Sequence, residues 1–276
     1  MQRFLCRLLS RLCPFFPLSL RIRLWLYLQG VGVRKWGRSV GAQVLPFGLY
    51  MKQRPISAEY VEDKVLQFVS THTSIPVPEL VDSFQHDGRQ VIIIQGLPGN
   101  DLFDITKVAT QLTSYLCQLR AIPLPHPPSI SGFASKSIRD TRLSLSNHPV
   151  TSFDTVAEFH KFFIACQFLE IPPQDEESVR KLITTAHEKP HSIVFTHNDL
   201  HPCNILVDRH LKITGIIDWE QAGWMPEYWE YTKACFVPIF NGSRSRWPVI
   251  MREVFPQYED ELKAEKALVR YRTVYN

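Results

Sequence analysis

Alternating and periodic hydrophobic positions predict a small strand-and-helix unit in the amino-terminal third of the chain. Residues 40–52 are strand-like and end in an apolar run. Residues 57–70 carry apolar side chains at helical spacing, with acidic residues in the first turn and Ser57 as the expected N-cap. Residues 80–84 and 91–95 predict two strands joined by a turn. We therefore expect a small sheet accompanied by one helix.

Helical patterns dominate the rest of the chain. A Gly-Leu-Pro-Gly break at 96–99 separates them from the small sheet. The predicted elements are helices at 101–120, 154–169 and 175–188, strands at 193–196, 205–207 and 213–217, and a mostly helical stretch from residue 228 onward. Proline-rich stretches at 123–128 and 172–173 interrupt the helices, because proline cannot donate the helical hydrogen bond. The order of elements predicts an α+β fold with a small sheet followed by a larger helical part.

Residues 1–28 combine apolar and basic positions. Arg3, Arg7 and Arg11 recur at every fourth position, while leucines gather on another helical face, which is an amphipathic pattern. The apolar run at 18–28 is too short and too charged to span a membrane, and no convincing cleavage site marks a signal peptide. Two interpretations stay open: helices that pack on the small sheet, or a peripheral membrane anchor.

Charge is distributed unevenly along the chain. Residues 1–58 contain ten Lys or Arg and no Asp or Glu, whereas the remainder contains 21 basic (31 minus 10) and 27 acidic residues. This asymmetry predicts an anion-facing or membrane-facing amino-terminal part. A nucleic-acid partner is not expected, since the basic residues lie in an apolar segment without a recognition motif.

The six cysteines are scattered without a C-x-x-C pair, which predicts reduced thiols in a cytoplasmic protein and no zinc site.

The most specific chemistry lies in residues 197–204, His-Asn-Asp-Leu-His-Pro-Cys-Asn, and in Ile-Ile-Asp-Trp-Glu at 216–220. The first segment has the H-x-D-x-x-x-x-N spacing of a kinase catalytic loop, with Asp199 and Asn204 at its two functional positions. Asp218 follows a short apolar strand, as the metal-binding Asp of kinases does. Phosphoryl transfer needs this set: one carboxylate to orient the acceptor hydroxyl, and oxygen ligands for a magnesium ion on the phosphates.

These segments, with Leu-Pro-Phe-Gly-Leu-Tyr-Met-Lys at 45–52 and Thr-His-Thr-Ser-Ile-Pro-Val-Pro at 71–78, resemble the aminoglycoside phosphotransferase and choline kinase family, particularly its fungal members. The resemblance implies a two-lobed, protein-kinase-like α+β fold. It divides the chain into a basic apolar extension (1–39), a small nucleotide-binding lobe (40–95) and a helical catalytic and substrate lobe (96–276). It also implies ATP and Mg²⁺ as cofactors and an aminoglycoside- or choline-like small molecule whose hydroxyl accepts the γ-phosphate.

The same resemblance assigns roles to individual residues. Asp199 is expected to be catalytic, and Asn204 and Asp218 are expected to bind magnesium. Lys52 is expected to contact the nucleotide phosphates and to pair with Glu62, with Glu59 as the less favoured partner. The hinge residues expected to offer backbone groups to adenine are Gln95, Gly96 and Leu97.

Two departures from the family pattern support an alternative. Asn198 stands where the family usually has Gly, and the glycines between residues 30 and 41 do not spell G-x-G-x-x-G. The alternative is a pseudokinase-type nucleotide-binding or interaction module with little turnover.

A cluster of large aromatic residues is expected to pack in the core, although such rings can also bind a quaternary ammonium group: Trp219, Trp224, Tyr228 and Trp229. The acceptor and the oligomeric state stay open.

Overall fold

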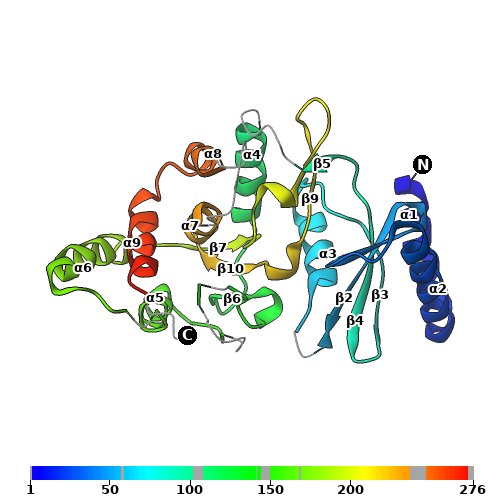
Figure 1. The fold of residues 1–276 in the computed structure, drawn as a ribbon, viewed down its shortest axis with the longest axis horizontal. Coiled ribbons are helices and arrows are strands. Elements are labelled where there is room, and N and C mark those ends of the chain that lie inside the picture. Colours follow the sequence, from blue (N-terminus) through cyan, green and yellow to red (C-terminus); the bar gives the residue numbers. More distant parts are fainter. Residues whose placement is uncertain are drawn as a thin grey trace.

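Two lobes make up the chain in the computed structural model, which describes residues 2–56, 59–101, 108–140, 142–143, 150–167, 169–236 and 247–272. The small lobe is built around a sheet at one end of the elongated molecule, and the larger lobe is mainly helical (Figure 1). Within these ranges, no helix is both long and apolar enough to cross a membrane. The order of the lobes is the one that the hydrophobic pattern predicts.

The small lobe contains a four-stranded antiparallel sheet in the order β1-β2-β4-β3. Its strands are β1 (Ala42–Leu45), β2 (Leu49–Pro55), β3 (Leu80–His86) and β4 (Arg89–Gln95). The strand-like run at 40–52 is therefore a hairpin and not a single strand. Pro46 begins its turn, and Phe47 and Gly48 adopt positive φ angles of 67° and 70°, which reverse the chain.

One helix, α3 (Glu62–His72), covers one face of this sheet. The prediction that this helix begins at residue 57 is wrong. Glu59 adopts a positive φ of 50°, and helical geometry begins only at Glu62. The predicted N-cap, Ser57, lies outside the described residues. Val65 and Val69 of α3 are fully buried in a core that continues into the large lobe.

Two further helices, α1 (Gln2–Leu12) and α2 (Leu18–Trp36), lie on the other side of the sheet (Figure 1). Asp82 of β3 holds α2 there, since its carboxylate accepts hydrogen bonds from Trp25 Nε1 at 2.7 Å and from the Arg21 guanidinium. Gly32 allows the α2 backbone to touch β1, because a Cβ atom there would lie 2.1 Å from the Val44 carbonyl oxygen. The inner face of α2 is thus a packing surface for the small lobe.

The large lobe surrounds two short three-stranded sheets, β6-β10-β7 and β5-β8-β9. Its helices are α4 (Ala109–Arg120), α5 (Val156–Ala165), α6 (Pro173–His187), α7 (Trp229–Phe236), α8 (Trp247–Val254) and α9 (Glu259–Arg270). Its strands are β5 (Asn100–Asp101), β6 (Ser131–Gly132), β7 (Ile193–Thr196), β8 (Ile205–Val207), β9 (Ile213–Ile216) and β10 (Gly223–Pro226). Residues 102–107 of the helix predicted at 101–120 lie outside the described residues. The hydrophobic pattern missed β6 and β10.

Candidate active site

Lys52 of β2 lies at the junction of the two lobes. Its ammonium group contacts both carboxylate oxygens of Glu62 at 2.8 and 2.9 Å and Oδ1 of Asp218, from the large lobe, at 2.9 Å. Burial by itself would lower the pKa of Lys52, but the two carboxylates outweigh it, so the pKa is raised and the side chain is charged. The predicted pairing with Glu62 is present. Glu59 instead accepts hydrogen bonds from the backbone and hydroxyl of Ser137.

Asp199 lies in the loop between β7 and the short helical turn at Pro202–Asn204. Asn204 Nδ2 donates to both its backbone oxygen and its Oδ2, at 2.7 and 3.0 Å. His201 Nε2 lies 3.2 Å from Oδ1. Burial would raise the pKa of Asp199, but the bond from His201 and the positive charge of Lys233 lower it overall. Asp199 is therefore an ionised hydrogen-bond acceptor at neutral pH.

His197 is fully buried, and its ring nitrogens connect the 197–204 segment to the 216–220 segment. Its Nδ1 accepts the backbone N–H of Asp199 at 3.2 Å, which leaves Nε2–H to donate to the Ile217 carbonyl at 2.9 Å. The ring also packs against the Trp219 indole with centroids 4.4 Å apart. These contacts make His197 a support for the loop, with no ring nitrogen left for acid–base chemistry.

Asn198 adopts the left-handed conformation, with φ of 61°. Asparagine tolerates this region better than most side chains do, so the residue that replaces the usual Gly keeps the backbone path. Its Nδ2 donates to the Gln221 carbonyl at 3.1 Å. The backbone N–H groups of His197 and Asn198 both donate to Oε2 of the buried Glu230, at 2.7 and 3.0 Å. Sequence reasoning missed Glu230, because a contact to backbone amides leaves no motif.

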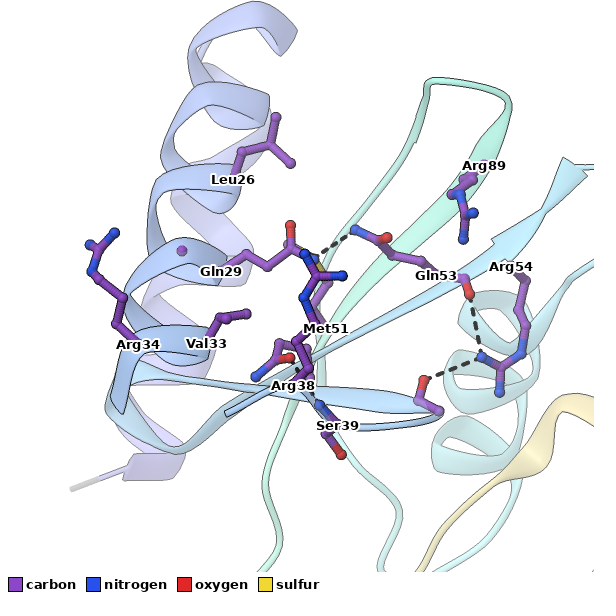
Figure 2. A pocket seen from close by; sticks show the side chains of 13 residues that line it. Leu26, Gln29, Val33, Arg34, Arg38, Ser39, Met51, Gln53, Arg54 and Arg89 are labelled. Carbon is purple, nitrogen blue, oxygen red and sulfur yellow. Dashed lines mark hydrogen bonds between the residues drawn. The ribbon is translucent and has the colours of Figure 1, made fainter. Parts of the chain in front are cut away.

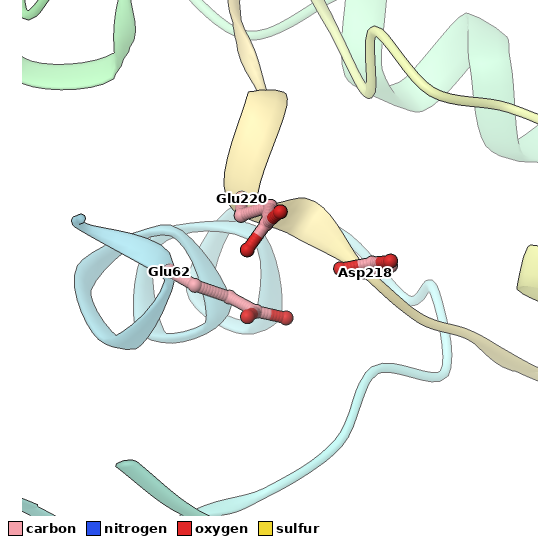
Figure 3. Close-up of side chains that lie close together, drawn as sticks. All are labelled: Glu62, Asp218 and Glu220. Carbon is pink, nitrogen blue, oxygen red and sulfur yellow. The ribbon is translucent and has the colours of Figure 1, made fainter. Parts of the chain in front are cut away.

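Three carboxylates meet where the lobes face each other: Glu62 from α3, and Asp218 and Glu220 from the segment after β9 (Figure 3). One oxygen from each lies within 4.8 Å of the others. Glu62 is already engaged by Lys52, by the Tyr60 hydroxyl and by the Trp219 backbone N–H. The backbone oxygen of Asn204 accepts the Ile217 N–H at 2.9 Å, which brings Asn204 next to Asp218. Asp218, Glu220 and Asn204 are thus the oxygen donors that could hold a cation.

The predicted hinge segment follows β4. The Gln95 N–H donates to the Glu79 carbonyl at 2.9 Å, and the Gly96 N–H donates to the Gly48 carbonyl at 2.8 Å. A Cβ atom on Gly96 would lie 2.6 Å from the Tyr50 ring, which explains the glycine. Gly215 of β9 makes similar room for the Leu97 side chain, since a Cβ there would lie 2.5 Å from it. An adenine at this segment would have to use backbone groups other than those two N–H donors.

The aromatic cluster is part of the core, as its default interpretation predicts. Trp219, Tyr228 and Trp229 are fully buried and Trp224 is 5% exposed. The face of Trp229 is already occupied by the Arg142 guanidinium, 3.7 Å from the ring centroid. The alternative interpretation, a cage of these rings around a cationic substrate, is therefore wrong.

The glycines between residues 30 and 41 do not form the turn of a β-hairpin, since Gly37 and Gly41 lie in the segment that joins α2 to β1. Gly30 and Gly32 belong to α2, and β1 is an edge strand of the small sheet, with α2 beside it and no further strand among the described residues. Instead, Arg54 reaches from β2 to Glu220 with Nε–Oε2 of 2.8 Å, a second ion pair between the lobes. No sequence motif predicts this pair.

Comparisons with known proteins agree with this geometry. A family model described as "Phosphotransferase enzyme family" matches residues 57–264. A search of the curated proteins finds no match. Aminoglycoside phosphotransferase APH(4)-Ia is similar in structure, with a TM-score of 0.56 and 17% identity, over 83% of this chain and 78% of that chain. A thermostable mutant of that enzyme, in a ternary complex with ADP and hygromycin B, gives 0.59 and 14% over 88% of both chains.

Macrolide 2'-phosphotransferase MphH from Brachybacterium faecium is also similar, with a TM-score of 0.51 and 17% identity over 82% of this chain and 77% of that chain. At such identities the likeness concerns the fold. The two-lobed, kinase-like α+β fold expected from the sequence is thereby confirmed.

Proposed function

Because the chain belongs to the phosphotransferase enzyme family, we propose that it transfers the γ-phosphate of ATP to a hydroxyl of a small molecule. The observation that carries the proposal is the convergence of Lys52, Asp199, Asn204 and Asp218 at the junction of the lobes. A family member that only binds a partner does not need the ionised Asp199 carboxylate next to Asn204 and Asp218, two possible cation ligands. The six cysteines have free thiols, which supports a cytoplasmic location.

In this proposal Lys52 neutralises the nucleotide phosphates. Glu62 stabilises the charge of Lys52. Glu62 is fully buried, and breaking its ion pair would leave a buried ammonium group without this counter-charge. Asp218 shares the same ammonium group but is about one-third exposed, so it is free to exchange partners. Glu62 is therefore the permanent counter-charge, and Asp218 is the exchangeable one.

Asp199 orients the acceptor hydroxyl. Its lowered pKa makes it a weak base, so its main contribution is to accept the hydroxyl hydrogen bond and align the oxygen with the γ-phosphorus. Proton removal is needed only late in a loose, metaphosphate-like transfer. The bonds from Asn204 and His201 fix the carboxylate for this task.

The donor set fits a magnesium ion. Asp218 offers a partly exposed carboxylate, and Asn204 uses its Nδ2 for Asp199 and so turns its side-chain oxygen away from that bond. Carboxylate and amide oxygens are the protein ligands that Mg²⁺ accepts beside phosphate oxygens. When bound there, the ion would neutralise charge that develops on the phosphates. We assign Asn204 and Asp218 to it, with Glu220 held nearby by Arg54.

A second candidate function is nucleotide binding with little turnover. The observation that favours it is that Gly37 and Gly41 stand between α2 and the edge strand β1, and not in a turn between two strands. Asn198 no longer supports this alternative, because its left-handed backbone suits the loop. The two candidates differ in turnover and not in nucleotide affinity.

A pair of measurements tests the proposal. Mg-ATP should raise the melting temperature of the wild type, and a screen of amino-alcohols, sugars and aminoglycosides should reveal acceptor-dependent ATP consumption. Asp199→Asn should keep the thermal shift and lose the transfer, whereas Asp154→Asn, an exposed acid remote from the loop, should keep both. A thermal shift without turnover on any acceptor would favour the second candidate. No shift at millimolar Mg-ATP would refute both.

A further inference from the structure

The side of α1 and α2 that faces away from the sheet is apolar and basic together. We call it the outer helical face, formed by Phe15 and Phe16 at the corner between the helices and by Leu20, Leu24 and Tyr27 on α2. These side chains are 83%, 51%, 52%, 48% and 66% exposed, in that order. Exposed side chains of this size are common singly, but five on one helical corner form an unpartnered patch. The small-lobe core is already complete without them, since Trp25 on the inner face is buried.

A cavity of about 630 Å³ opens beside this face, between α2 and the strands. Arginines from three different elements line it: Arg34 and Arg38 at the end of α2 and just after it, Arg54 on β2, and Arg89 on β4. Figure 2 shows Arg38 in the space between α2 and the strands, with Arg54 and Arg89 on the strand side. Among the described residues, ion pairs link Arg54 to Glu220 but link no carboxylate to the other three. Arg34, Arg38 and Arg89 thus line one cavity, and no ion pair in the described part of the chain gives them a counter-charge.

This cavity borders the candidate active site at Arg54, which lines the cavity and pairs with Glu220, but Lys52 does not line it. Met51 lines it, and Met51 precedes Lys52 on β2, so the two side chains point to opposite faces of the sheet. Leu26 and Arg34 of α2 line it as well, which places its mouth next to the outer helical face. An occupant of the outer helical face would therefore meet the arginines without reaching Lys52.

Charge decides which occupant fits. Residues 1–58 contain ten basic and no acidic residues, so a second copy of the chain would oppose like charges on this face. A surface that is both apolar and anionic is complementary, and a bilayer with acidic headgroups has this combination. We propose that the outer helical face docks peripherally on an anionic phospholipid bilayer. The exposed aromatic and leucine side chains enter the headgroup region, and a lipid phosphate occupies the arginine-lined cavity.

Vesicle flotation of the full chain tests this proposal. The protein should float with vesicles of phosphatidylcholine and phosphatidylserine, and much less with phosphatidylcholine alone. Each basic residue near an anionic surface is worth about a fivefold change in partitioning, so the triple variant Arg34→Gln, Arg38→Gln and Arg89→Gln should lose about a hundredfold. The matched control is Lys161→Gln, Arg180→Gln and Lys181→Gln, three exposed basic residues in the large lobe, which should float like the wild type.

A second variant separates apolar insertion from charge. Phe15→Ser with Phe16→Ser alters only exposed positions, so it should melt like the wild type and lose most vesicle binding even at low salt. Equal flotation of the triple variant and its control would overturn the proposal, as would equal binding to both vesicle types. A thermal shift with millimolar inorganic phosphate but no flotation would mean that the cavity is a site for a free anion, and would also overturn it. A dimer that forms without lipid and is abolished by the phenylalanine variant would assign the face to a second copy instead.

Discussion

Replacing Glu230 by Ala is expected to loosen the catalytic loop while leaving the nucleotide-side residues in place. Glu230 is 2% exposed, and its Oε2 is the acceptor for two successive backbone N–H groups, those of His197 and Asn198. No other acceptor for these two N–H groups is found in the described structure. Without the carboxylate they become buried donors with no partner, directly before Asp199.

The magnitude follows from those two bonds. A buried donor left without a partner costs about 1–3 kcal/mol, so two of them cost about 2–6 kcal/mol of unfolding free energy. For a domain of this size that corresponds to a drop in melting temperature on the order of 10 °C. Turnover should fall further than stability predicts, since a displacement of about 1 Å in a positioned carboxylate can cost about a hundredfold in rate.

The assay combines thermal melting with turnover in the presence of Mg-ATP. Glu227→Ala is the matched control, because that glutamate lies three positions earlier and is only partly buried. Glu230→Gln keeps an oxygen acceptor and should recover most of both losses. If Glu230→Ala melts and turns over like Glu227→Ala, Glu230 does not hold the loop. If Glu230→Ala loses stability but keeps full turnover, the support is structural without positioning Asp199.

Other changes have expected outcomes as well. Asp82→Ala should lower unfolding free energy by about 3–5 kcal/mol in a denaturant titration, since it strands the buried partners on α2; an unchanged midpoint would contradict this packing. Burial and neighbouring imidazoles lower the pKa of His160 to about 3, and burial lowers that of His187 to about 4, so both stay neutral in the folded protein while the unfolded chain takes up protons below about pH 6.5. The free energy of unfolding should therefore be highest above that pH. As the pH drops towards 4 it should fall by up to about 1.4 kcal/mol per pH unit for each histidine, and His160→Gln should make this fall less steep. Asn198→Gly should melt close to the wild type, whereas Asn198→Ala should lose about 1–2 kcal/mol because alanine has no compensation for the left-handed backbone; equal melting of the two variants would refute the conformational argument.

The parts of the site that the sequence predicted are those carried by short, contiguous segments. Asp199 and Asn204 belong to one loop, and Asp218 follows a strand that pairs with the strand after that loop, so fixed spacing brings them together. The pair of Lys52 and Glu62 was predicted for a different reason. The family resemblance implies a strand lysine paired with a helix glutamate, and a buried lysine needs such a carboxylate.

Contacts to backbone groups, and contacts between residues far apart in the sequence, could not be predicted from the sequence. Glu230 binds amide groups, which every residue has, and Arg54 meets Glu220 only because the lobes fold together. The start of α3 was misplaced because Ser57 and the acids after it satisfy local helix rules, while Glu59 is bonded to Ser137 in the other lobe. In each case tertiary contacts decided what local preference left open.

The hydrogen bond from Lys52 to Asp218 has a consequence for how the protein meets a nucleotide. The Asp218 carboxylate already binds the Lys52 ammonium group, in the position proposed for a nucleotide phosphate. Nucleotide binding is then an exchange of one anion for another, and the protein gains only the difference between the two attractions. Salt weakens both sides of such an exchange, so affinity should depend less on ionic strength than the number of charges in the site suggests.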